Sequence, residues 1–229
     1  MSETSANISA RRERGNPSSK EPAVAPRWVI EVLRNLFFPL SRLLWGLRFK
    51  GVENIPSEEV GGIIIAANHQ TYIDPFWMSI PVKRPIRYLA WNEAFAWPIV
   101  GKVMSLLGAW PLQLERSSPR AMRRSLKWLR EGGALVIFPE GARCFSDGEM
   151  QKFKAGAVRL AIEAGIPILP VTIKGGNKVW PRDYSYPKLG RIEIIYHPLH
   201  YYSISENQDL KEYTQRETER LAEIIASAL

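Results

Sequence analysis

The sequence predicts an α/β fold in which a mostly parallel or mixed sheet is covered by helices. Short apolar runs alternate with helical segments, which is the pattern of such a sheet. The chain has 229 residues, enough for one domain with a full core but not for a second large one. Its apolar share of 45% and charged share of 24% are typical of a folded globule rather than a disordered or multi-spanning chain.

The N-terminal part divides into two predicted segments. Residues 1–26 are polar, lack the apolar core and cleavage site of a secretory signal, and are expected to form a flexible tail. Residues 27–49 confine their polar side chains to one narrow helical stripe, which predicts an amphipathic helix bent at Pro39. The broad apolar face of this helix holds Trp28, Leu33, Leu36, Phe37, Leu40, Leu44 and Trp45.

This helix is expected to lie in a membrane interface. Its longest charge-free stretch runs only from Asn35 to Ser41, far less than a membrane-spanning helix needs. We expect its apolar face to enter the acyl region while its arginines meet lipid phosphates. The alternative is a helix packed against its own domain.

Residues 50–229 are predicted to form the folded domain. Residues 62–67, 134–138, 166–173 and 191–196 are predicted strands, and residues 119–131, 155–164 and 208–228 are predicted helices. Residues 94–112 are apolar apart from Lys102 and contain several prolines and glycines. We expect a helix there that lines a lipid-tail groove or rests on a bilayer, with ordinary core as the alternative.

Charge and composition narrow the classes of partner. A formal net charge of +8, with eight each of Trp, Tyr and Phe, suits an anionic lipid surface as well as nucleic acid. The single cysteine, Cys144, excludes an intramolecular disulfide and a cysteine-based zinc site. Histidines occur only at positions 69, 197 and 200, so no metal centre is expected.

The first candidate site follows the first predicted strand. His69 lies just beyond that strand, and Asp74 begins the next predicted helix with Pro75 after it. A tight turn can bring the carboxylate to one imidazole nitrogen, which leaves the other nitrogen able to take a proton. The alternative is structural, because Asp followed by Pro is also a common helix N-cap.

A second cluster, residues 138–143, follows another predicted strand and should reach the same edge of the sheet as His69. Glu140 is a candidate to bind a substrate hydroxyl, and Gly141 allows the backbone to approach a ligand closely. Arg143 is a candidate to hold a phosphate with its planar guanidinium. A solvated turn is the alternative interpretation of these residues.

Four ordered motifs within residues 50–205 resemble the glycerolipid acyltransferase family typified by 1-acylglycerol-3-phosphate acyltransferase. Residues 68–75 resemble the family's His-four-residues-Asp motif, and residues 138–143 resemble its Phe-Pro-Glu-Gly-Thr-Arg motif. Residues 168–171 are similar to the fourth block, a strand with a proline. The middle block is matched by Glu93, Pro98, Gly101, Gly108, Glu115 and Arg116.

The resemblance implies an acyltransferase that uses His69 as general base and Asp74 as its orienting carboxylate. It implies that Arg116 and Arg143 hold the acceptor phosphate, while Glu140 and Gly141 position the glycerol portion. The expected acceptor is a lysophospholipid, most directly 1-acylglycerol-3-phosphate, and the acyl donor is acyl-CoA or acyl carrier protein. No cofactor is implied, and we expect a monotopic association with the cytoplasmic face of a membrane.

Three positions depart from the family pattern. Asn92 replaces a common Lys, Glu115 replaces the usual Asp, and Ala142 replaces Thr. The missing charge at position 92 leaves another lysolipid or an amino-lipid hydroxyl open as acceptor, although Lys152 and Lys154 can compensate.

Two other classes compete with this interpretation. A metal-dependent hydrolase would use His69 and Asp74 as ligands, but the sequence lacks the further ligand spacing that such sites need. A non-enzymatic lipid-binding or nucleic-acid-binding module would rely on the basic helix, and of these we expect no nucleic-acid partner.

Overall fold

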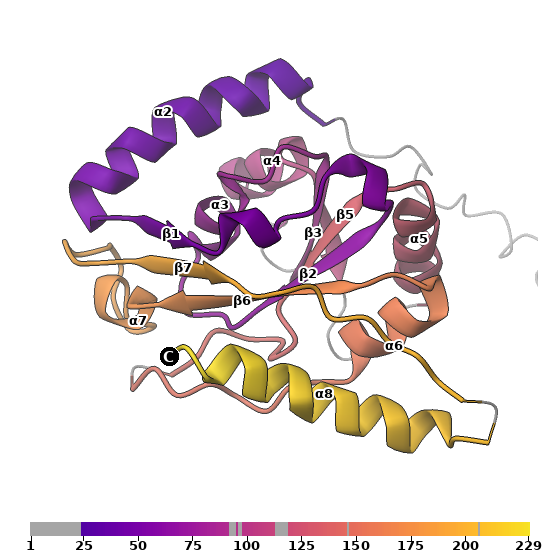
Figure 1. Cartoon of the computed structure of the whole chain (residues 1–229). Helices are drawn as coiled ribbons and strands as arrows, with labels where there is room; N and C mark the ends of the chain where they lie inside the picture. The colour runs from indigo at the N-terminus through magenta and orange to yellow at the C-terminus, as the bar shows by residue number, and fades with distance from the viewer. Residues whose placement is uncertain (1–23, 92–94, 96–97, 113–118, 146, 206) are drawn as a thin grey trace, which may run out of the picture.

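The structure is a computed structural model that describes residues 24–91, 95, 98–112, 119–145, 147–205 and 207–229. A seven-stranded mixed sheet forms its centre, with the strand order β1-β7-β6-β2-β5-β3-β4. Helices cover both faces of this sheet (Figure 1). The predicted α/β class with a mixed sheet is therefore confirmed.

The strands run parallel except at one point in the sheet. β6 pairs antiparallel with β7, and β7 in turn pairs parallel with β1. The remaining pairs are parallel, so β2, β5 and β6 end at the same edge. The strands are β1 (Arg48–Lys50), β2 (Ile63–Ala67), β3 (Ile86–Trp91), β4 (Ala109–Leu112), β5 (Ala134–Ile137), β6 (Ile168–Lys174) and β7 (Glu193–Tyr196).

Alternate residues of the central strands build two cores. Ile63 and Ile65 of β2 face one side, whereas Ile64 and Ala66 face the other, as the period of two in a strand requires. All five residues of β2 are buried, as expected of a parallel strand covered on both faces. The first core is covered by α2 (Arg27–Trp45), α3 (Asp74–Ser79) and α7 (Gly176–Val179), and the second by α5 (Pro119–Arg130), α6 (Gly156–Ala164) and α8 (Leu210–Ala226).

Helix α2 is shorter than the helix predicted at residues 27–49. It ends at Trp45 because Gly46 adopts the left-handed conformation, with φ 49°. Residues 48–50 leave the helix and pair with β7 instead. Trp45 is buried against the sheet, so this helix packs on the domain at its C-terminal end.

Two of the arginines of α2 that were predicted to meet lipid phosphates bind backbone carbonyl oxygens of the domain, whereas Arg42 is exposed. Arg34 donates to the Val82 carbonyl oxygen at 2.7 Å, and Arg27 donates to that of Lys83 at 2.8 Å. The reason is that the α3–β3 connection offers carbonyl oxygens that need donors. Part of the apolar face of α2 is exposed, namely Trp28, Val32, Leu33, Leu36, Leu40 and Leu43.

The apolar region after β3 is not one continuous helix. It forms α4 (Pro98–Leu106) and then β4, and the two are separated at Gly108, where φ is 90°. The other predicted strands and helices are confirmed to within two residues at each end. Two short 3-10 turns, Val52–Asn54 and Glu58–Val60, connect β1 to β2.

Among the described residues, none of the helices combines the length and apolar character needed to cross a bilayer. The predicted tail at residues 1–26 lies mostly outside the described part of the chain.

Candidate active site

The candidate site lies where β2, β5 and β6 end side by side. His69 follows β2, residues 138–143 follow β5, and both strands contribute loops to the same edge because they are parallel neighbours. The backbone of the two loops meets directly, since the Cys144 amide donates to the His69 carbonyl oxygen at 2.7 Å. The structure therefore brings the two predicted clusters together.

His69 and Asp74 form a close pair. The His69 Nδ1 atom lies 2.9 Å from Oδ2 of Asp74, whose side chain is fully buried. That oxygen also accepts the Gln70 and Thr71 amides at 2.6 and 2.7 Å, while Oδ1 accepts the Thr71 hydroxyl at 2.6 Å. The carboxylate thus binds the preceding turn and makes no capping hydrogen bond to α3.

These contacts select one imidazole tautomer. A carboxylate oxygen that receives backbone N–H donors acts as an acceptor, so Nδ1 of His69 carries the proton and Nε2 has the free lone pair. The ring also stacks on Phe138, with centroids 4.0 Å apart and 20° between the planes. The His69 side chain remains 19% exposed, so the candidate base is oriented but reachable.

Two polar side chains beside His69 anchor the turn to β6 and α7. The Asn68 side chain donates to the Ile173 carbonyl oxygen and accepts the Ile173 amide, at 2.9 and 2.7 Å. The Gln70 Oε1 atom accepts the Gly176 amide at 2.7 Å. The sequence analysis assigned these residues no role, and the only sequence signal is a run of polar residues directly after a buried strand.

Glu140 braces the two loops from a buried position. Its two carboxylate oxygens accept the His69 and Gln151 amides, each at 2.7 Å. Burial raises the pKa of Glu140 to about 7, the two amide donors oppose this, and the Asp74 carboxylate adds to it. The predicted contact with a substrate hydroxyl remains a prediction, because this side chain is occupied by backbone donors.

Gly141 lies under the side chain of Lys154. Its φ is 76°, and a β-carbon there would approach Lys154 Nζ to 2.7 Å. The positive φ favours glycine at this turn, whereas the Lys154 side chain could move away from a β-carbon. Lys154, which the sequence analysis considered only as compensation for a missing charge, has its ammonium beside the loop after β5.

Arg143 lies in the loop after β5, against Tyr72. Its guanidinium covers the ring of Tyr72 at 3.6 Å, and within the described part of the chain its Nη1 atom has no hydrogen-bond partner. Its carbonyl oxygen accepts Gln151 Nε2 at 2.7 Å. This side chain is thus positioned by stacking, and its Nη1 atom is a buried donor without a partner. Arg116, the other predicted phosphate ligand, lies outside the described residues, as do Glu93, Asn92 and Glu115.

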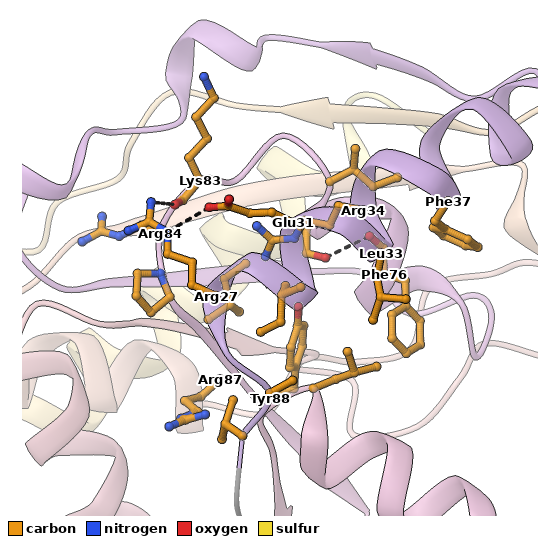
Figure 2. Close-up of a pocket in the computed structure, with 18 of the residues that line it drawn as sticks. Arg27, Glu31, Leu33, Arg34, Phe37, Phe76, Lys83, Arg84, Arg87 and Tyr88 are labelled. Carbon is orange, nitrogen blue, oxygen red and sulfur yellow. Dashed lines mark hydrogen bonds and ion pairs between the residues drawn. The ribbon is translucent and has the colours of Figure 1, made fainter.

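An apolar cavity of about 570 Å³ lies between α2, α3, β3 and α4, a volume within the ~300–1,000 Å³ range of small-molecule sites. Ile73 and Phe76 line it from the same short segment that carries Asp74, and Val103 and Leu107 line it from α4 and the residue after it. Figure 2 shows Arg27, Glu31 and Lys83 close together at one side of the cavity.

The site places an oriented imidazole at the carboxyl edge of an α/β sheet. An arginine with a partnerless, buried Nη1 atom lies in the neighbouring loop, and an apolar cavity is lined by residues of the segment that carries Asp74. Across the described residues, no three His, Cys, Asp or Glu side chains are grouped to hold a metal ion.

Comparison with known proteins identifies the class of protein. The model of the family described as Acyltransferase matches residues 46–174, more than half of the chain. The chain belongs to this acyltransferase family.

Individual relatives carry more specific names. A 1-acyl-sn-glycerol-3-phosphate acyltransferase of Pseudomonas aeruginosa is 29% identical over 87% of this chain and 77% of its own length. The crystal structure of the 1-acyl-sn-glycerophosphate (LPA) acyltransferase PlsC from Thermotoga maritima superposes with a TM-score of 0.66 and 26% identity, covering 86% of this chain and 79% of that one.

Two chloroplastic 1-acyl-sn-glycerol-3-phosphate acyltransferases are longer than this chain. The Arabidopsis thaliana protein is 29% identical over 67% of the chain, and the Brassica napus protein is 30% identical over 58%. The matched regions span only 44% and 38% of those two relatives.

Proposed function

We propose that this protein transfers a fatty acyl group from a thioester to the free hydroxyl of a lysophospholipid, most directly 1-acylglycerol-3-phosphate, which would yield phosphatidic acid. The observation that supports this best is the His69–Asp74 pair, with Nε2 free on the edge that also carries Arg143. The names of the relatives point to the same acceptor.

In the proposed reaction, Nε2 of His69 takes the proton of the acceptor hydroxyl as its oxygen attacks the thioester carbonyl. A new C–O bond forms, the tetrahedral intermediate collapses, and the C–S bond breaks. The imidazolium returns the proton to the leaving thiolate. No covalent acyl-enzyme is required, because the thioester is already activated and the hydroxyl attacks it directly.

Positioning contributes more than proton transfer in this scheme. General-base catalysis typically accelerates a reaction by about 10²–10⁴-fold. Correct orientation of two reactants lowers the activation free energy by ~7–11 kcal/mol, which is the larger effect. Arg143, with its unpaired Nη1, is proposed to hold the acceptor phosphate, and Arg116 is proposed to assist it. Lys154 is available beside Gly141 as a further cation.

The cavity beside α3 is the proposed site for an acyl chain. Ile73 and Phe76 lead to it from the segment that holds Asp74, and its walls are largely apolar. His69 does not itself line the cavity, and the proposed link between tail and base is the short segment that carries Asp74 together with the lining residues Ile73 and Phe76.

Membrane association through α2 is proposed to supply both lipids. Leu36 and Leu43 are exposed on the face opposite Phe37, Phe38 and Trp45, which pack on the domain. Exposed leucines on a helix near basic residues favour a position in the interface of an anionic bilayer. We place the protein on the cytoplasmic face, in a monotopic arrangement.

One assay tests the reaction and the acceptor together. The full chain is incubated with one acyl-CoA and a panel of lysolipids and amino-lipids, while free thiol and product mass are measured. Thiol release only in the presence of 1-acylglycerol-3-phosphate, absent in His69→Ala, supports the proposal. Thiol release with a different lysolipid would identify that lipid as the acceptor. Lipid binding without any thiol release would identify a non-enzymatic lipid-binding module.

A further inference from the structure

The connection between α7 and β7, residues 181–191, presents exposed aromatic and apolar side chains that the proposed reaction does not use. Tyr186 is 70% exposed and Leu189 is 76% exposed, and Tyr184 is also exposed. The same connection holds three basic residues, Arg182, Lys188 and Arg191, and one acidic residue, Asp183. An aromatic and apolar tip with basic neighbours is the composition of membrane-interface segments.

This connection is held in place by the domain. The Lys188 amide donates to the Val179 carbonyl oxygen at 2.7 Å, and the Lys188 carbonyl oxygen accepts Trp45 Nε1 at 3.0 Å. Lys188 Nζ covers the Tyr184 ring at 3.7 Å from its centroid. The exposed side chains therefore project from a supported loop.

The loop contacts the C-terminal end of α2. Trp45, which binds the Lys188 carbonyl oxygen, is the last residue of α2, and Leu43, two residues earlier, is 81% exposed. In Figure 1 the C-terminal end of α2 and the segment between α7 and β7 lie at the same side of the molecule. A bilayer that receives α2 would thus meet the loop as well.

The loop also adjoins the candidate active site. Trp180 contacts the ring of Tyr72 edge-on at 5.6 Å, and Arg182 donates to the Arg143 carbonyl oxygen at 3.3 Å. Arg182 further covers the ring of Phe145, an exposed side chain of the loop after β5, at 5.3 Å. Aromatic and basic groups therefore extend from Arg143 and Phe145 to the loop tip.

We propose that residues 184–189 form a second bilayer contact that inserts Tyr186 and Leu189 into an anionic membrane and turns the catalytic edge toward it. This inference rests on the proposed membrane association. The bilayer is favoured over a protein partner because the patch combines a net positive charge with exposed apolar side chains, and because it lies at the same side of the molecule as the C-terminal end of α2.

Single-site labelling tests the contact. Cys144 is the only cysteine and is 2% exposed, so Y186C in the full chain gives one accessible thiol for an environment-sensitive fluorophore. We expect a blue shift of emission on vesicles of phosphatidylcholine and phosphatidylglycerol. The matched control is Y201C, because Tyr201 is 64% exposed and follows the bridge of His200 to Ile168, at the opposite edge of the sheet.

Vesicle sedimentation adds a quantitative readout. Y186S combined with L189S should weaken partition at least about tenfold, whereas Y201S combined with I204S should keep wild-type partition. Equal partition of the two double variants, or no shift at position 186, overturns the proposal. A fall in the solution mass of the Y186S/L189S protein without vesicles also overturns it, in favour of a second copy of the chain.

Acyl transfer to detergent-dispersed substrate separates this inference from the proposed reaction. The Y186S/L189S protein should retain wild-type turnover there, because neither side chain contacts His69 or Arg143. Absence of turnover in the wild-type protein, with the fluorophore shift intact, would end the proposed reaction and leave the bilayer contact standing.

Discussion

Oδ2 of Asp74 lies 2.9 Å from Nδ1 of His69 and also accepts two backbone amides from the turn between them. One buried oxygen therefore fixes both the shape of the turn and the tautomer of the imidazole. This double use makes the carboxylate sensitive to a change of one atom.

Asp74→Asn is the sharpest test of that relationship. In one orientation the asparagine amide nitrogen would face all three N–H donors, those of Gln70, Thr71 and His69. In the other it would face the Thr71 hydroxyl, and both orientations lose the negative charge that stabilises the imidazolium. We expect kcat to fall by at least about a hundredfold while the KM for the thioester changes little. Steady-state kinetics measures this effect. The control variant is Asp209→Asn, which makes the same change at the N-cap of α8. Wild-type kcat in Asp74→Asn would contradict the proposed orienting role.

The raised pKa of Glu140 should make the free energy of unfolding depend on pH. Its pKa is raised to about 7 in the folded protein from an ordinary value of 4.5, so folding favours the protonated carboxyl. The stability associated with this group is complete below pH 4.5 and is lost as the pH rises through about 7. The free energy of unfolding should fall by on the order of 3 kcal/mol from this group between pH 4.5 and 8.

Glu140→Gln tests this slope in urea titrations followed by tryptophan fluorescence. The variant should be less stable at pH 5 by about 1–3 kcal/mol, because its amide nitrogen faces a backbone donor. It should also lose most of the decline with pH. Glu149→Gln, at an exposed residue of the same loop, should keep the wild-type profile. An unchanged slope in Glu140→Gln would assign the decline to other groups.

Arg143 should act mainly on the acceptor. Arg143→Ala removes the free guanidinium donor, and we expect the acceptor KM to rise about ten- to hundredfold with a smaller change in kcat. Arg143→Lys keeps the charge but loses the planar stack on Tyr72, so an intermediate KM is expected. Lys211→Ala, on the exposed side of α8, serves as the control in the same assay. A selective loss of kcat would contradict phosphate binding.

Leu107 tests the cavity as an acyl site. Leu107→Trp narrows the cavity, and kcat/KM for the longest accepted acyl chain should fall about tenfold or more relative to shorter chains. Leu106→Trp is a matched control, because Leu106 is next to Leu107 in the chain but its side chain is exposed and does not line the cavity. Competition between acyl-CoA molecules of several lengths gives the ratio directly. Identical chain preference in both variants would place the tail elsewhere.

The exposed face of α2 predicts a separate loss of vesicle binding. Leu36→Ser combined with Leu43→Ser should reduce sedimentation with anionic vesicles while the free energy of unfolding changes by less than about 1 kcal/mol. Leu210→Ser, at an exposed position of α8, is the control. Deletion of residues 1–49 is not suitable, because it removes Trp45 from the core and part of β1 from the sheet. Full vesicle binding by the double variant would refute the role of this face.

Much of the fold could be predicted because the central strands are short, apolar and bounded by glycines or polar residues. The strands missed, β1, β3 and β4, have weaker patterns. β1 has three residues and continues an amphipathic helix, and β4 contains Pro111 within an apolar stretch that resembles a helix. β1 pairs with β7, β3 with β5 and β4 with β3, and these pairings depend on tertiary neighbours that local periodicity does not contain.

The candidate site was predictable in part. His69 and Asp74 are five positions apart, so their pairing follows from a tight turn. The contact between Glu140 and the His69 amide spans 71 positions, and the choice between a backbone amide and a substrate hydroxyl depends on loop geometry. The orientation of Arg34 likewise depends on a carbonyl oxygen 48 positions away.

Asn68 has a consequence for how lipids would enter the protein. Its side chain takes the place of a peptide group opposite Ile173, so the peptide units around His69 are free to bind Glu140 and Cys144 instead. The backbone of His69 is thereby hydrogen-bonded to the loop after β5, and we expect the two to move together. Bulky amphiphiles must then be admitted by movement elsewhere in the protein. The cavity between α2, α3, β3 and α4 is where time-resolved hydrogen exchange should detect local opening.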